Sequence, residues 1–387
     1  MIEYKKNSKI LFAAVIFFWF AQYVYIPFQT PYLMGIGTSA GMVGMIIGAY
    51  GISQMVLRLP VGVLADCRKR HKKFIIIGGL SSGIASIFRI IMQNGTGFLI
   101  ANLFSGFASA MWISFMVLYM SFYPSEQQKA TSQLVLANNL GMLIGFVTST
   151  LFYKKLGMPV ICMFGVMAGI CCALIACRLK ETKCQTSSNS AESAALPGNM
   201  LCVCYNRRLL FFAVLALVQQ GVQMSTTMSF TTQIIKNLGA DTMILGISCI
   251  IYMLSAVVWA KFASTKACSV LSPKNWIFLV FCTTAGYCLL IPVSTSILVI
   301  CLLQILPGMA TGILFSFLTC EAMKSVPAEK KSTAMGCFQA IYALGMTVFP
   351  IICGKIAGEF SMTVAYLCLA VICIIAAVGS RFTPASL

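Results

Sequence analysis

The chain has 387 residues, of which 59% are hydrophobic and only 9% are charged. Soluble domains have about 25% charged residues, so this composition excludes an ordinary soluble protein. The 27 basic residues outnumber the nine acidic ones and give a formal net charge of +18. Their positions indicate membrane topology, and no nucleic-acid partner is expected. Most of the 18 cysteines lie in apolar runs and are expected to be small buried hydrophobes.

Apolar runs long enough to cross a bilayer recur along the whole chain. About 20 helical residues span roughly 30 Å of hydrocarbon, and continuous runs of this length without alternation indicate helices. We therefore expect an all-α integral membrane protein with twelve transmembrane helices. The predicted spans lie near residues 9–33, 39–65, 73–93, 97–122, 129–153, 157–178, 209–235, 242–265, 274–293, 296–320, 331–354 and 360–380.

The basic residues predict how these spans are oriented. If both termini and every loop after an even-numbered span lie on one side, 21 of the 27 bases lie on that side. Only four bases lie in the opposite loops. Because cytoplasmic loops carry such an excess of Lys and Arg, both termini are expected in the cytoplasm. The chain is then a multi-pass protein of a bacterial-type plasma (inner) membrane.

Residues 181–199, between the sixth and seventh predicted spans, change to a polar composition rich in Ser and Ala. Such a segment is typical of a flexible linker. It divides the chain into an N-terminal six-helix half (1–178), a cytoplasmic linker (179–208) and a C-terminal six-helix half (209–387).

The two predicted halves repeat several residues in the same order, at offsets of 202 to 204 positions. Matches with one order and nearly one spacing indicate a duplication. Two halves of six spans each have the same orientation, so they can face each other across an axis along the membrane normal. The matches include Gly37 with Gly239, Gly44 with Gly246, Gly106 with Gly308, and Leu140-Gly141-Met142 with Leu344-Gly345-Met346.

The loop after the second span reads Gly62-Val-Leu-Ala-Asp66-Cys67-Arg68-Lys69-Arg70. It resembles the signature loop of the major facilitator superfamily, in which a glycine, three residues and an aspartate precede a basic turn. Cys67 replaces a usual base and Lys69 a usual glycine. With the spans, the duplication and the linker, the resemblance covers the whole chain. It implies the major facilitator fold of two pseudo-symmetric six-helix halves.

Residues in and before this loop are candidates for gating. Gly62 allows another helix to approach closely, and Asp66 opposes the helix dipole at the end of its span, so it needs a cationic or amide partner. The resemblance implies that Asp66 is a gating residue and that Arg70 belongs to a latch between the halves. The alternative is a solvated loop that only sets topology. Arg58, roughly 12 Å further inward, either lines the cytoplasmic vestibule and attracts an anion or is neutralised by helix-end carbonyls.

Polar residues in spans 1, 4, 7 and 10 are the substrate-binding candidates, because the resemblance implies that these spans line the central cavity. In spans 1 and 7 the candidates fall on single helical faces. They either bind a solute or join helices, and both interpretations stay open. The candidates are Gln22, Tyr25, Gln29, Asn102, Gln219, Gln223, Thr227 and Gln304.

The placement of ionisable residues bears on energy coupling. All nine acids fall in loops or at span ends, whereas a membrane proton carrier usually needs a buried carboxylate or histidine. Asn102 stands where the superfamily motif has an arginine implicated in proton coupling. We therefore expect facilitated movement, or coupling to the charge of the substrate, and not obligatory proton antiport. Arg89, late in the third span, is expected to snorkel to the outer interface.

The sequence has no recognisable enzyme or metal site. His71 is the lone histidine, and motifs for a nucleophile, a phosphate-binding loop or a metal site are missing. We expect no catalytic residue, metal or cofactor. The predicted function is that of a monomeric secondary transporter that moves a small organic solute by alternating access, with the solute and the lipid bilayer as partners. The alternatives are a proton-coupled efflux pump for drugs or metabolites and a membrane receptor or scaffold that transports nothing.

Overall fold

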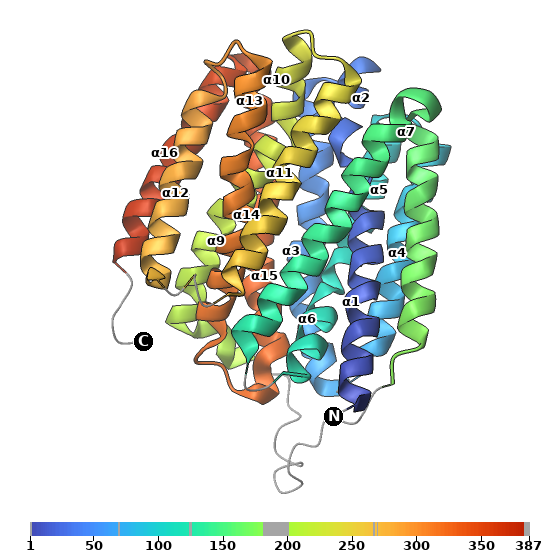
Figure 1. The fold of residues 1–387 in the computed structure, drawn as a ribbon, viewed down its shortest axis with the longest axis vertical. Coiled ribbons are helices and arrows are strands. Elements are labelled where there is room, and N and C mark those ends of the chain that lie inside the picture. The colour runs from blue at the N-terminus through green and yellow to red at the C-terminus, as the bar shows by residue number, and fades with distance from the viewer. Residues whose placement is uncertain are drawn as a thin grey trace, which may run out of the picture.

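The computed structural model describes residues 2–68, 70–123, 126–180, 201–265, 268 and 270–382. Within these residues every regular element is a helix, which confirms the predicted all-α class. Figure 1 shows the long helices side by side along one axis, with α1–α7 on one side of the bundle and α9–α16 on the other. These two groups are called the N-half and the C-half.

The first group follows the order of the first six predicted spans, and the second follows the order of the last six. The N-half contains α1 (Ile2–Tyr23), α2 (Ile26–Gly35), α3 (Ala40–Arg68), α4 (Lys72–Ile91), α5 (Gly95–Ala110), α6 (Trp112–Ser121) and α7 (Gln127–Cys177). The C-half contains η1 (Cys202–Tyr205), α9 (Arg207–Ser225), η2 (Thr226–Phe230), α10 (Thr231–Asn237), α11 (Thr242–Ala263), α12 (Pro273–Leu290), α13 (Ile297–Leu303), α14 (Ile305–Met323), η4 (Ala328–Lys330), α15 (Lys331–Glu359) and α16 (Met362–Arg381).

Ten segments of the described chain are long and apolar enough to cross a membrane. One of them, Lys129–Cys177, contains both the fifth and the sixth predicted spans. They are separated at Gly157, whose backbone is non-helical with a φ of 73°. The helix α12 occupies the place of the ninth predicted span but is not among the ten. The helical membrane fold is therefore confirmed, whereas the count of twelve spans stays a prediction.

The outer faces of the helices carry large apolar side chains. Leu174, Leu298 and Ile375, for example, are 63%, 69% and 65% exposed. Soluble monomers rarely expose contiguous apolar patches of large extent. Lipid contact accounts for such a surface, since helices satisfy their backbone hydrogen bonds internally and can face hydrocarbon.

Four predicted spans are interrupted along their length: the first, fourth, seventh and tenth. The first breaks between α1 and α2, where Pro27 lies in the first turn of α2. The fourth breaks at Met111 and the tenth at Gln304, while the seventh contains the π-helical segment η2. Proline and π-helical turns both disturb the regular hydrogen-bond ladder, and π-turns are frequent at functional sites.

The two halves meet along the helix pairs α3 with α15 and α7 with α11. Figure 1 shows α3 and α15 at the centre of the bundle. Glycines make this approach possible, because a Cβ at Gly62 would lie 2.5 Å from the carbonyl oxygen of Ser332. Likewise, a Cβ at Gly336 would lie 2.6 Å from the carbonyl oxygen of Arg58. The close approach expected at Gly62 is therefore present.

The predicted linker, residues 179–208, lies mostly outside the described residues. The chain just before it is held by the N-half, since Asn7 donates a hydrogen bond to the carbonyl oxygen of Lys180 at 2.9 Å. Its last residues already belong to the C-half, because α9 begins at Arg207. The division of the chain at this segment stays a prediction.

Candidate functional site

A cavity of about 40 Å³ lies between the two halves. Small-molecule sites usually measure about 300–1,000 Å³, so in this state the halves are closed around a contracted cavity. Its lining combines aromatic rings with amide and hydroxyl groups from seven helices. The lining residues are Trp19, Tyr23, Tyr50, Gln54, Arg58, Trp112, Val135, Asn138, Asn139, Met142, Gln220, Gln223, Thr311, Phe315, Tyr342 and Met346.

Contacts between the halves lie toward both ends of the bundle. The linker end is the end at which α1 begins, at the bottom of Figure 1. At the opposite end, which carries α2 and α10, the hydroxyl oxygens of Thr30 and Ser229 are 3.3 Å apart. Close by, Lys236 donates a hydrogen bond to the carbonyl oxygen of Pro31 at 3.0 Å. This end of the interface is therefore closed by polar contacts as well as by helix packing.

Asp66 closes the interface at the linker end. Its carboxylate accepts hydrogen bonds from the backbone N–H groups of Ser332 and Thr333, at 3.3 and 2.7 Å, and from the Thr333 hydroxyl at 2.7 Å. Because these amides form the first turn of α15, the negative charge lies at the positive end of that helix dipole. Asp66 therefore has the amide partners that its position at the end of α3 requires. Arg70, by contrast, is exposed.

Arg58 lies two turns before Asp66 on α3 and is only 1% exposed. Its Nη1 donates a hydrogen bond to the carbonyl oxygen of Gln339 at 3.2 Å, and its guanidinium carbon lies 4.6 Å from the ring centre of Tyr342. Both partners belong to α15. Arg58 is thus a buried cation at the cavity, in contact with the opposite half.

Gln223 is the one predicted substrate residue that lines the cavity. Its Nε2 donates to the hydroxyl of Tyr252 at 2.7 Å, and that hydroxyl lies 2.7 Å from the hydroxyl of Thr311. Gln219, one turn earlier, donates to Oε1 of Gln223 at 3.2 Å. Gln223 therefore belongs to a connected polar wall of the C-half.

Tyr25 and Asn102 lie in a different cluster, inside the N-half. Nη2 of Arg89 donates hydrogen bonds to Tyr25 Oη, Asn102 Oδ1 and Ser105 Oγ at 2.7, 2.8 and 2.9 Å. Gln22 joins the same cluster through a hydrogen bond to the carbonyl oxygen of Ser105 at 3.1 Å. The expectation that Arg89 snorkels is wrong, because its side chain is 1% exposed and lies 3.6 Å from the Tyr25 ring centre.

The remaining candidates also lie away from the cavity lining. Gln304 contacts the hydroxyls of Tyr287 and Ser248 within the C-half, at 3.3 and 3.2 Å. The hydroxyl of Thr227 donates to a carbonyl of its own helix, that of Gln223. Gln29 is 1% exposed, and its Oε1 has no hydrogen-bond partner.

Tyr50 and Gln54 are cavity residues that the sequence analysis missed. With Arg58 they recur at intervals of four residues, so all three share one face of α3. That spacing was the signal that could have found them. Aromatic packing then shapes the cavity wall, as Trp19 and Trp112 meet edge to face with ring centres 5.2 Å apart.

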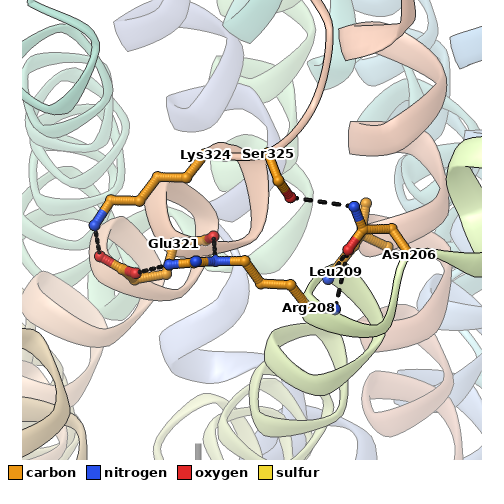
Figure 2. Close-up of polar contacts among 6 residues, drawn as sticks. All are labelled: Asn206, Arg208, Leu209, Glu321, Lys324 and Ser325. Carbon is orange, nitrogen blue, oxygen red and sulfur yellow. Dashed lines mark hydrogen bonds and ion pairs between the residues drawn. The ribbon is translucent and has the colours of Figure 1, made fainter. Parts of the chain in front are cut away.

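An ion-pair cluster ties the start of α9 to the end of α14. Figure 2 shows the Glu321 carboxylate between Arg208, whose Nη2 is 2.5 Å away, and Lys324. Asn206 caps α9 by accepting from the N–H groups of Arg208 and Leu209, and it also donates to Ser325. Glu321 is thus neutralised by two cations near the linker end and does not line the cavity.

Solved structures share this fold along almost the whole chain. The nucleoside transporter NupG has a TM-score of 0.71 and 14% identity, with 98% of this chain and 100% of that chain covered. The human organic anion transporter MFSD10 has a TM-score of 0.73 and 13% identity, with 97% and 99% covered. At these identities the likeness concerns the fold alone.

Sequence relatives match shorter stretches. An uncharacterized MFS-type transporter of Methanocaldococcus jannaschii is 24% identical over 150 residues, which cover 37% of this chain and 39% of the relative. The inner membrane transport protein YajR of Escherichia coli is 27% identical over 140 residues, or 35% of this chain and 30% of that protein. The matches thus span well under half of these relatives. The family model described as Major Facilitator Superfamily, however, matches residues 11–282 and 271–386, and the chain belongs to that family.

Proposed function

We propose that this protein moves a small organic solute across the plasma membrane by alternating access, with the N-half and the C-half rocking about the cavity between them. Family membership makes it a secondary transporter and not an enzyme. The observation that carries the proposal is the cavity itself, because both halves supply polar side chains to it. Since contacts join the halves at both ends, breaking one set at a time would open the cavity to one side only.

The linker end is taken as the cytoplasmic side. The excess of basic residues in the loops predicted for that side supports this orientation. Asp66 then belongs to the cytoplasmic gate, since its contacts with α15 must break when the cavity opens to the cytoplasm. Gly62 supports the same role, because it lets α3 and α15 close against each other.

A thermal-shift screen followed by counterflow would test this function. Small solutes are first added to the purified protein, because a ligand of the folded state raises its apparent stability. A solute that raises the melting temperature is then loaded into proteoliposomes, and labelled solute is added outside. Alternating access predicts transient accumulation of the label by exchange. Binding without any exchange would favour the receptor or scaffold alternative.

A further inference from the structure

The charge buried at the cavity points to the class of solute. Arg58 combines 1% exposure with only neutral partners, the Gln339 carbonyl and the Tyr342 ring, and its Nε has no hydrogen-bond partner. A guanidinium stays charged in proteins and offers five donors in a fork that matches a carboxylate or phosphate. The cavity wall therefore contains a full positive charge with donor capacity to spare.

No acidic side chain of the described residues forms an ion pair with Arg58. Buried charges are normally paired, because removing an unpaired charge from water is costly. The two carboxylates nearest the linker end have other partners. Asp66 accepts hydrogen bonds from the amides of α15, and Glu321 forms ion pairs with two cations. Among the other acids whose side chains the structure describes, Glu126, Asp241 and Glu359 pair with surface lysines, and Glu329 is exposed.

A buried acceptor lies one turn before this cation. Gln54 is fully buried, and its Nε2 donates to the carbonyl oxygen of Tyr50 at 3.2 Å. A carbonyl oxygen can accept a hydrogen bond from the NH2 group of the Gln54 amide but not from its oxygen. The atom facing Tyr50 is therefore Nε2, and the other atom of the amide is Oε1. Its Oε1 is left without a partner at the cavity. An N–H or O–H group of a solute would satisfy it.

We propose that Arg58 binds an oxyanion of the transported solute, a carboxylate or a phosphate, and that Gln54 accepts a hydrogen bond from a hydroxyl or amine of the same molecule. The inference rests on the proposed transport function and names its substrate class as small organic anions with a hydrogen-bond donor. Both contacts of the Arg58 guanidinium cross to α15, so closing the halves buries its charge. A bound anion neutralises that charge and favours closure of the loaded cavity over the empty one.

The first test needs no ligand. Arg58→Gln removes an unpaired buried charge, so the melting temperature of the solute-free protein should stay level or rise. Arg381→Gln is the matched control, because Arg381 also contacts one oxygen, of Asn275, and one ring, of Phe278, but is exposed at the end of α16. A clear fall in melting temperature for Arg58→Gln, with the control unchanged, would give Arg58 a structural role and overturn the proposal.

The second test measures binding with anions and their neutral partners. The probes are lactate and glycerol phosphate, each of which carries a hydroxyl group, beside the neutral lactamide and glycerol, so carboxylate and phosphate are distinguished. At least one anion should stabilise the parent while its neutral partner does not, and Arg58→Gln should lower its affinity at least tenfold. If Arg58→Gln does not fold, Arg58→Lys decides, because it keeps the charge but loses the fork and should also bind more weakly.

The proposal is overturned if no anion of the panel binds, if neutral partners bind equally, or if the Arg58 variants keep full anion affinity. Its failure can be separated from that of the transport proposal. Anions that bind through Arg58 but do not exchange across proteoliposomes would refute transport alone. A neutral solute that exchanges equally in parent and Arg58→Gln would refute the anion assignment alone.

Discussion

Asp66 lies in the closed interface between the halves and not in the cavity lining. A substitution at Asp66 should therefore affect the movement of the halves more than the binding of solute. Asp66→Asn keeps the side-chain size but removes the negative charge at the start of α15. We expect the closed state to lose about 1–2 kcal/mol, or roughly five- to thirtyfold in its population relative to the open state. Exchange in proteoliposomes should slow, while solute affinity changes little. Normal exchange with equal protein would remove Asp66 from the gate.

The amides predicted to bind solute divide into two kinds in the structure. Gln223 lines the cavity, so Gln223→Ala should weaken solute binding by about tenfold through the loss of one hydrogen bond. Asn102 accepts from the buried Arg89, so Asn102→Ala should lower the melting temperature more than the affinity. Both quantities are to be measured for both variants. The reverse pattern would move the site from the cavity to the Arg89 cluster.

Cys204, in η1, offers a pH-dependent probe outside the membrane-spanning helices. A hydrogen bond with Cys337 lowers the pKa of Cys204 to about 7. The thiolate is the reactive form, so it accumulates as the pH rises through about 7. Maleimide labelling of the Cys202→Ser variant should therefore accelerate between about pH 6 and 8, and Cys204→Ser should lose this phase. A half-maximal rate near pH 9 would contradict the shifted pKa.

At the scale of elements, the contact of α3 with α15 depends on the missing side chain of Gly62. Gly62→Ala places a Cβ 2.5 Å from a backbone carbonyl of α15, so the closed interface should lose about 1–3 kcal/mol. Gly286→Ala, in α12, meets nothing within 4 Å and should leave the melting temperature level or raise it. Exchange should slow in Gly62→Ala only. Equal melting temperatures and exchange rates in both variants would show that α3 and α15 can move apart to accommodate the added Cβ without loss of stability.

The helices could be predicted because a helix that crosses the hydrocarbon of a bilayer needs a long apolar run. The repeat could be recognised from glycines that adopt the same backbone conformation in both halves. Gly37 and Gly239 both have a left-handed backbone, with φ of 88° and 85°. The interruption at η2 was not predictable, because no proline marks it. It depends on tertiary packing, which a hydropathy pattern does not encode.

The site was less predictable, since inside a membrane protein a polar face can turn toward a neighbouring helix as well as toward a cavity. Gln22 and Gln223 have the same chemistry, yet one joins helices in the N-half and the other lines the cavity. Arg89 was predicted to snorkel because it lies near the end of its helix. The position of a residue along a helix, however, does not determine the direction in which its side chain points. Its hydroxyl and amide partners hold it inward.

At the scale of the whole molecule, the acidic residues considered for proton coupling lie toward the linker end, whereas the charged residue at the cavity is basic. The two carboxylates best placed to carry a proton, Asp66 and Glu321, are each engaged by several donors toward the linker end. The charged group at the cavity is instead the cation Arg58. Under the proposed function, an anionic solute would therefore carry only its own charge across the membrane.

This arrangement predicts coupling to the membrane potential and not to a pH gradient. For a solute with one negative charge at every pH tested, proteoliposomes with an imposed pH gradient should reach the same internal level as controls. An inside-positive potassium diffusion potential should raise that level about tenfold per 60 mV, because moving one charge through 100 mV changes its energy by about 2.3 kcal/mol. Arg381→Gln should behave as the parent does. Accumulation that follows the pH gradient and disappears with a protonophore would refute this coupling and make Asp66 and Glu321 the proton carriers to test.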